Sequence, residues 1–127
     1  MGDPSGDVVR RFMMGTESGD FESISDLVHD DFVMYWPQSG ERFVGRDNAF
    51  GAMQVQEIRP RMAGEPRLIG SGEVWVMMVP LNYDEDLFHY VAVLELQDGR
   101  LKRATGYWGS PFPAQKSRAR FAEGASS

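Results

Sequence analysis

Residues 34–47, MYWPQSGERFVGRD, read as a strand that meets a proline, turns and leads into a helix. The aromatic and β-branched residues of segment 32–36 favour a pleated backbone, and Pro37 has no amide hydrogen to donate to a strand ladder. The strand is therefore predicted to end at Trp36. Because turns of this kind often border ligand sites, the role of Trp36 becomes the first functional question.

Helices are predicted on both sides of this strand. Asp3 and Pro4 form an N-cap and first-turn pair that starts an amphipathic helix, which is expected to stop within residues 15–20. A second short helix is expected over residues 21–28, and a third over residues 46–59. The N-terminal half is thus predicted to be mainly helical.

The second half of the chain changes to long runs of β-branched and aromatic residues. Residues 98–99, Asp-Gly, are a strong signal for a two-residue hairpin. Such a loop would pair Leu96 with Leu101 and Glu95 with Lys102, and a bulge would shift this register. Helices followed by antiparallel strands predict an α+β fold.

Composition excludes several classes of function. The 127 residues suit a single domain, and the chain has no cysteine, which excludes disulfides, thiolate nucleophiles and cysteine metal sites. A net charge of −6 argues against nucleic acid, and the basic cluster Lys116, Arg118 and Arg120 is better explained as a solvated tail or a subunit contact. We expect a soluble, cytoplasmic protein with no membrane association, no cofactor and no metal.

Three segments in order carry a family resemblance: residues 19–47, the hairpin LQDGRL at 96–101, and TGYWGSPFPA at 105–114. Together they resemble the nuclear transport factor 2 superfamily, and most closely its SnoaL-like (polyketide-cyclase) and ketosteroid-isomerase-like branch. The resemblance covers about residues 8–114 and implies one SnoaL-like domain over residues 1–127, with a tail at 115–127. It implies a cone-shaped, curved, antiparallel-rich sheet wrapped around the N-terminal helices as an α+β barrel. It also implies an internal pocket for a small-molecule ligand, and frequently a homodimer.

The resemblance does not carry the isomerase chemistry with it. The family's basic aspartate corresponds to Trp36 here, its hydroxyl donor to Phe12, and its second acid to Ala92 or Val91. None of these side chains transfers a proton to a carbonyl substrate, so isomerisation by that mechanism is not supported. Phe12, Trp36 and Trp108 are instead expected to line the pocket.

Other candidate residues are weighed against ordinary packing. Tyr35 and Trp75 are further candidate ligand-binding residues, and His89, whose free pKa suits proton transfer, is the candidate catalytic residue if it faces the pocket. An iron site would need His29 and His89 to converge on one carboxylate, a demanding requirement. Three further residues are candidate hydrogen-bond donors or simply packed side chains: Tyr83, Tyr90 and Tyr107.

Three functions remain open at this level. The chain is an enzyme acting on a small, largely apolar metabolite, such as an isomerase, dehydratase, cyclase or hydrolase; a ligand-binding domain without chemistry; or a dimerisation module. An enzyme requires polar groups in its cavity, whereas a dimerisation module requires an apolar patch on the outer face of the sheet.

Overall fold

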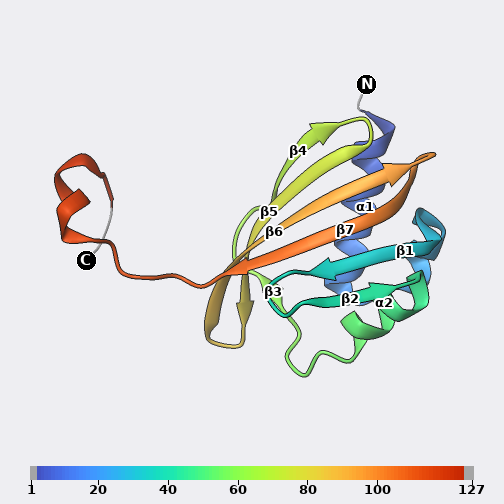
Figure 1. Cartoon of the computed structure of the whole chain (residues 1–127), viewed down its shortest axis with the longest axis horizontal. Coiled ribbons are helices and arrows are strands. Elements are labelled where there is room, and N and C mark those ends of the chain that lie inside the picture. Colours follow the sequence, from blue (N-terminus) through green and yellow to red (C-terminus); the bar gives the residue numbers. More distant parts are fainter. Residues whose placement is uncertain (1–2, 125–127) are drawn as a thin grey trace.

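The computed structural model describes residues 3–124 and places two α-helices against one face of a seven-stranded sheet (Figure 1). Residues 1–2 and 125–127, which the predicted domain includes, lie outside the described part. The helices are α1 (Pro4–Ser18) and α2 (Arg46–Gln54), with the 3₁₀ helices η1 (Glu22–Leu27) and η2 (Lys116–Phe121). The strands are β1 (Val28–Trp36), β2 (Glu41–Val44), β3 (Arg61–Met62), β4 (Arg67–Ser71), β5 (Val74–Tyr83), β6 (Asp86–Gln97) and β7 (Arg100–Gly109).

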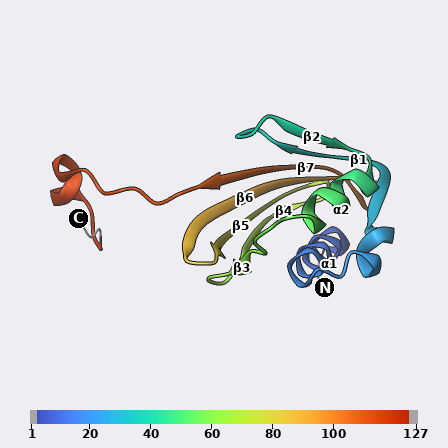
Figure 2. The same cartoon turned by 90° about the horizontal axis from the view of Figure 1, so that it is seen from below.

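The strand order in the sheet is β2-β1-β7-β6-β5-β3, and β4 also pairs with β5. All neighbouring strands run antiparallel except β1 and β7, which are parallel. Figure 2 shows the sheet curving over α1 and α2, which lie on its concave side. The predicted α+β class with a curved sheet around the N-terminal helices is confirmed, although the sheet stays open and does not close into a barrel.

Helix α1 begins and ends where its sequence predicts. The Asp3 Oδ1 atom accepts a hydrogen bond from the Ser5 amide at 3.0 Å, Pro4 occupies the first turn, and Gly19 adopts the left-handed conformation at the C-cap. A Cβ atom on Gly15 would lie 2.5 Å from Ile24 Cγ2. The small residue therefore lets η1 pack directly on the backbone of α1.

Two helix predictions are wrong in extent. The second helix is a 3₁₀ helix that ends at Leu27, and Val28 already belongs to β1. The third ends at Gln54, because the next apolar residues, Val55 and Ile58, are exposed and do not pack on the core. Residues 55–60 form a loop instead.

The predicted hairpin forms at residues 98–99. Both turn residues have positive φ, 53° and 76°, as the twist of a two-residue hairpin requires. Leu96 pairs with Leu101, which confirms that part of the register.

A bulge follows between Glu95 and Leu96 and changes the next pair. Glu95 pairs with Arg103, so the predicted partner, Lys102, is wrong. Lys102 instead donates to Asp31 Oδ2 on β1 at 2.6 Å.

The residues that follow β7 form a separate feature, which we call the arm (residues 110–124). The arm leaves the sheet after Gly109 and extends away from the body to η2 (Figures 1 and 2). In the described chain, α1 and the shorter helices lack the length and apolar character needed to cross a membrane.

Candidate functional site

A cavity of about 180 Å³ lies between the concave face of the sheet and the helices. Side chains from α1, α2, the loop at 55–60 and five strands of the sheet (β1, β3, β5, β6 and β7) enclose it. Five of the chain's eight methionines line it, which gives a soft and polarisable wall. These methionines are Met13, Met34, Met53, Met62 and Met77.

Trp36 is placed in this wall by strand alternation. Phe32, Met34 and Trp36 occupy alternate positions of β1 and therefore share the concave face. The Trp36 ring packs edge-on against Phe43 at a centroid distance of 4.7 Å and against Trp108 at 5.3 Å. The residue at the family's catalytic-base position thus forms part of an aromatic wall.

Two tyrosines supply hydroxyl groups to the cavity. The Trp108 Nε1 group donates to the Tyr83 hydroxyl oxygen at 2.8 Å, which leaves the hydroxyl hydrogen of Tyr83 available to donate. The Tyr90 ring packs against Trp108 with centroids 4.8 Å apart. A Cβ atom on Gly106 would lie 2.9 Å from the Tyr90 hydroxyl oxygen, so this glycine makes room for the ring.

Burial raises the pKa of both tyrosines above the ordinary value of 10.0. It raises the pKa of Tyr83, and the hydrogen bond from Trp108 opposes this in part. Burial also raises the pKa of Tyr90, and the nearby Tyr83 adds to the effect. At neutral pH the two phenols are therefore hydrogen-bond donors and not bases.

A second hollow of about 440 Å³ opens outward from the first, and we call it the vestibule. The cavity and the vestibule share Trp36, Gln56, Tyr83 and Trp108. The Trp108 amide donates to Gln38 Oε1 at 2.5 Å, and Gln38 Nε2 donates back to the Trp108 carbonyl oxygen. This pair of bonds fastens the turn after Trp36 to β7 and holds the boundary between the two hollows.

Polar residues lie at the helix side of the cavity. Thr16 and Glu17 come from the last turn of α1, and Arg59 comes from the loop. Among the described residues that line the cavity, Glu17 alone carries a carboxylate. The Arg59 guanidinium lies directly against Gly19, near the negatively polarised end of α1.

Of the five predicted ligand-binding residues, Trp36 and Trp108 line the cavity. Phe12 lies in the core, where its ring is 6.2 Å from that of Phe32. Trp75 is buried beneath α1, and its Nε1 group donates to the Gly72 carbonyl oxygen at 3.0 Å. Tyr35 alternates with Met34 and Trp36, so it points to the convex face.

The two histidines also lie away from the cavity. His89 is exposed on β6 between Phe88 and Tyr90, whose side chains line the concave hollows, so His89 faces outward. The pocket-facing orientation on which its proposed acid–base role depends is therefore not present. His29 Nε2 lies 2.6 Å from the Gln97 carbonyl oxygen, at the opposite end of β6.

The two histidines consequently do not converge on one carboxylate. Across residues 3–124, no cluster of three or more histidine, cysteine, aspartate or glutamate side chains has a geometry suited to a metal ion.

The alternation of β6 also decides between the two alignments of the family's second acid. Ala92 is buried on the concave face, whereas Val91 points outward. The concave position is thus occupied by a methyl group.

Comparison with known proteins supports the fold directly. No protein-family model and no curated protein matches the sequence. Among solved structures, an NTF-2 like protein of unknown function from Burkholderia xenovorans superposes with a TM-score of 0.84 at 26% identity, covering 97% of this chain and 96% of its own. A "putative ketosteroid isomerase" from Kribbella flavida superposes with a TM-score of 0.87 at 21% identity, covering 98% and 91%. The chain has the nuclear transport factor 2-like fold.

A third solved structure with the nuclear transport factor 2-like fold is named as a different kind of enzyme. A "putative polyketide cyclase" from Xanthomonas campestris superposes with a TM-score of 0.73 at 16% identity, covering 82% of this chain and 89% of its own. The resemblance to the SnoaL-like and ketosteroid-isomerase-like branch, predicted from sequence, is confirmed by these matches. At 21% and 16% identity, the two matches named as enzymes show the fold alone and specify no reaction for this nuclear transport factor 2-like chain.

Proposed function

We propose that the cavity binds one small, largely apolar metabolite whose oxygen atom accepts hydrogen bonds from Tyr83 and Tyr90. The observation that carries the proposal is the bond from Trp108 to Tyr83, because it occupies the phenol as an acceptor and leaves it a donor. The thioether wall suits an apolar body. A volume of about 180 Å³ suits a single ring, since an apolar cavity of about 150 Å³ holds benzene.

Two probes of nearly equal shape test this proposal: acetophenone, which carries a carbonyl oxygen, and ethylbenzene, which does not. The readout is the indole NH signals of the three tryptophans in a ¹H–¹⁵N spectrum. Trp36 and Trp108 line the cavity and should shift on titration, whereas Trp75 is buried elsewhere and should not. No shift with either probe, or equal shifts of all three indoles, would contradict a ligand site here.

The hydroxyl groups are tested by the variants Tyr83→Phe and Tyr90→Phe. We expect acetophenone to bind about 30-fold more tightly than ethylbenzene, since each of the two hydrogen bonds contributes about 1 kcal/mol. Each variant should reduce this preference. Tyr35→Phe, on the convex face, is the matched control and should keep it.

A second candidate function is proton transfer, and it rests on Glu17. This carboxylate lies in the cavity wall together with the two phenols, so it is placed to accept a proton from carbon while the phenols stabilise the enolate oxygen. Exchange of the acetophenone methyl protons in D₂O measures this chemistry. Exchange that is lost in Glu17→Gln supports an enzyme, whereas binding without exchange supports a ligand-binding domain without chemistry.

A further inference from the structure

Four aromatic side chains in the wall of the vestibule form one connected set. The Trp36 and Trp108 rings stand at 87° to each other with centroids 5.3 Å apart. The Tyr83 and Phe88 rings stand at 90° with centroids 5.5 Å apart, and the hydrogen bond from Trp108 to Tyr83 joins the two pairs. All four side chains are half-buried, so part of each ring remains accessible from the hollow. Because the faces of aromatic rings are electron-rich, they attract cations.

Strand pairing places two carboxylates beside these rings. Glu41 is the direct partner of Trp36 in the β1–β2 ladder, and Asp86 is the direct partner of Tyr83 in the β5–β6 ladder. Directly paired residues project from the same face of a sheet, with Cβ atoms about 5 Å apart. Both carboxylates therefore line the vestibule together with the rings. In the described part of the chain, neither carboxylate forms an ion pair with a lysine or an arginine.

The neighbouring basic side chains point away from the vestibule. Arg42 pairs with Tyr35 and Arg61 pairs with Asn82, and both partners occupy outward-facing positions of their strands. His89 also faces outward. Across residues 3–124, no lysine, arginine or histidine lines the vestibule. Its electrostatic potential is thus set by carboxylates and ring faces, which favour a positively charged group.

Two polar side chains of the vestibule wall are already occupied by hydrogen bonds. Gln38 is bonded in both directions to the backbone of Trp108. The Ser39 hydroxyl donates to the Trp36 carbonyl oxygen and accepts from the Glu41 amide, both at 3.4 Å. An ammonium group with N–H donors would leave some of them unpaired against the ring faces, whereas a fully methylated ammonium has none to satisfy. Aromatic cages recognise methylated ammonium groups for this reason.

We propose that the vestibule binds a fully methylated ammonium group, held against the ring faces and balanced by Glu41 and Asp86. This inference rests on the proposed function of the cavity, because the two hollows share four wall residues and one ligand can occupy both. It narrows the ligand to a class: an apolar ring in the cavity, an oxygen atom at the two phenols, and a trimethylammonium group in the vestibule. Arg59 does not oppose the cation, since its guanidinium lies against Gly19 and lines only the cavity.

Two probes of nearly equal shape test the charge: phenacyltrimethylammonium and 3,3-dimethyl-1-phenylbutan-1-one. Both contain the acetophenone skeleton, and the quaternary nitrogen of the first is a quaternary carbon in the second. Dissociation constants come from titrations of the indole NH signals of Trp36 and Trp108. We expect the cation to bind about tenfold more tightly than the uncharged ketone. Equal affinities, or tighter binding of the ketone, would overturn the proposal.

Tetramethylammonium separates this inference from the cavity proposal, because it has no ring. It should shift the indole signals of Trp36 and Trp108 and leave that of Trp75 unchanged, whereas sodium chloride at the same ionic strength should shift none of them. If these shifts occur and acetophenone does not bind, the cavity proposal fails and the cation site stands. If acetophenone binds and tetramethylammonium causes no shift, the cation site fails and the cavity proposal stands.

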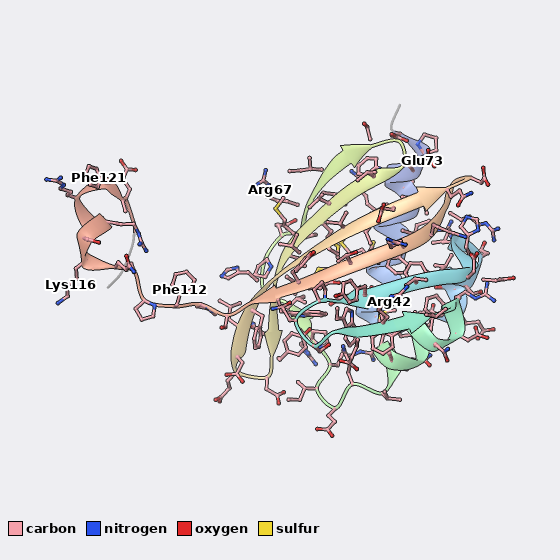
Figure 3. All side chains as sticks on the ribbon, in the orientation of Figure 1. Arg42, Arg67, Glu73, Phe112, Lys116 and Phe121 are labelled. Carbon is pink, nitrogen blue, oxygen red and sulfur yellow. The ribbon has the colours of Figure 1, made fainter. Side chains whose placement is uncertain are left out.

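The carboxylates are tested by the double variant Glu41→Gln/Asp86→Asn. It should lower the preference for phenacyltrimethylammonium about fivefold at low salt, since two exposed charge contacts are lost. The control Glu73→Gln/Asp98→Asn removes the same charge from turns at the opposite end of the β5–β6 ladder, where Figure 3 shows Glu73, and should keep the preference. Equal losses in the two double variants would point to the overall charge and overturn the site.

The ring faces are tested by Phe88→Leu, which keeps an apolar side chain and removes one ring from the vestibule. The preference for the cation should fall about threefold. The control Phe121→Leu changes a phenylalanine on the arm, which Figure 3 shows away from the sheet, and should have no effect. Urea denaturation confirms that both variants are folded during the titrations. An undiminished preference in Phe88→Leu would contradict the aromatic cage.

Discussion

Gly106 offers a direct test of how the cavity is built. The glycine lies on β7 beneath Tyr90, and a Cβ atom there would come 2.9 Å from the Tyr90 hydroxyl oxygen and 3.1 Å from its Cε1 atom. The ring cannot retreat freely because it packs against Trp108. Inserting a methyl group into such a site costs about 1 to 3 kcal/mol.

Part of this cost is offset in the unfolded state. Alanine restricts the unfolded chain and returns about 0.4 to 1 kcal/mol. We therefore expect Gly106→Ala to lower the free energy of unfolding by about 1 to 2 kcal/mol. It should also weaken acetophenone binding, because Tyr90 is displaced.

Urea denaturation of the variant and a matched control measures the effect. Gly109→Ala lies on the same strand, where the nearest atom to the new Cβ, the His89 carbonyl oxygen, is 3.9 Å away, so it should be neutral or slightly stabilising. Combining Gly106→Ala with Tyr90→Phe removes the closest atom and should recover part of the loss. If Gly106→Ala unfolds at the wild-type urea concentration, or if Gly109→Ala loses as much, the described packing of Tyr90 is incorrect.

Three other predictions follow from individual contacts. Gly15→Ala should destabilise the protein although alanine favours helices, because its Cβ atom would lie 2.5 Å from Ile24. In Gly51→Ala the new Cβ atom has no atom within 4 Å, so the free energy of unfolding should rise by about 1 kcal/mol. Thermal melts of the two variants should therefore shift in opposite directions. Backbone hydrogen bonds lower the pKa of Asp3 below its ordinary value of 3.8, so its contribution to stability is present above that pH and is lost as the pH falls through the lowered pKa. In acid unfolding experiments, the free energy of unfolding of Asp3→Ala should therefore lack the decrease that protonation of Asp3 causes in the wild type as the pH falls. Burial raises the pKa of Tyr90 above 10.0, so the protonated Tyr90 side chain contributes fully to stability at neutral pH and this contribution declines as the pH rises past 10. The Tyr90→Phe variant has no phenol to ionise, so its alkaline unfolding should be shifted to higher pH.

The local signals in the sequence were sufficient for most of the fold. The cap at Asp3, the strand end at Pro37 and the turn at residues 98–99 each act within a few neighbouring residues, and all three occur where predicted. The extent of α2 was not predictable, since it depends on whether further side chains find a core to contact. That early end creates the loop at 55–60, which contributes Gln56 and Arg59 to the cavity.

The candidate site could be predicted only in part. Trp36 and Trp108 were expected in the pocket and line it, but Phe12 and Trp75 fill the core and Tyr35 and His89 face outward. Aromatic content indicates that a residue packs, and it does not indicate which face of a strand carries it. The five methionines gave no recognisable pattern because they come from elements far apart in the chain.

By itself, the sequence determined the class of fold, the order of its elements and the presence of a tryptophan instead of a carboxylate before Pro37, because capping, turn formation and residue identity are properties of short segments. Tertiary structure alone decided the rest. Strand register and the bulge after Glu95 assign each side chain to one face of the sheet, and the curvature of that sheet brings Tyr83, Tyr90 and Trp108 to a common hollow. These are contacts between distant segments, and their free energy exists only once the chain has folded.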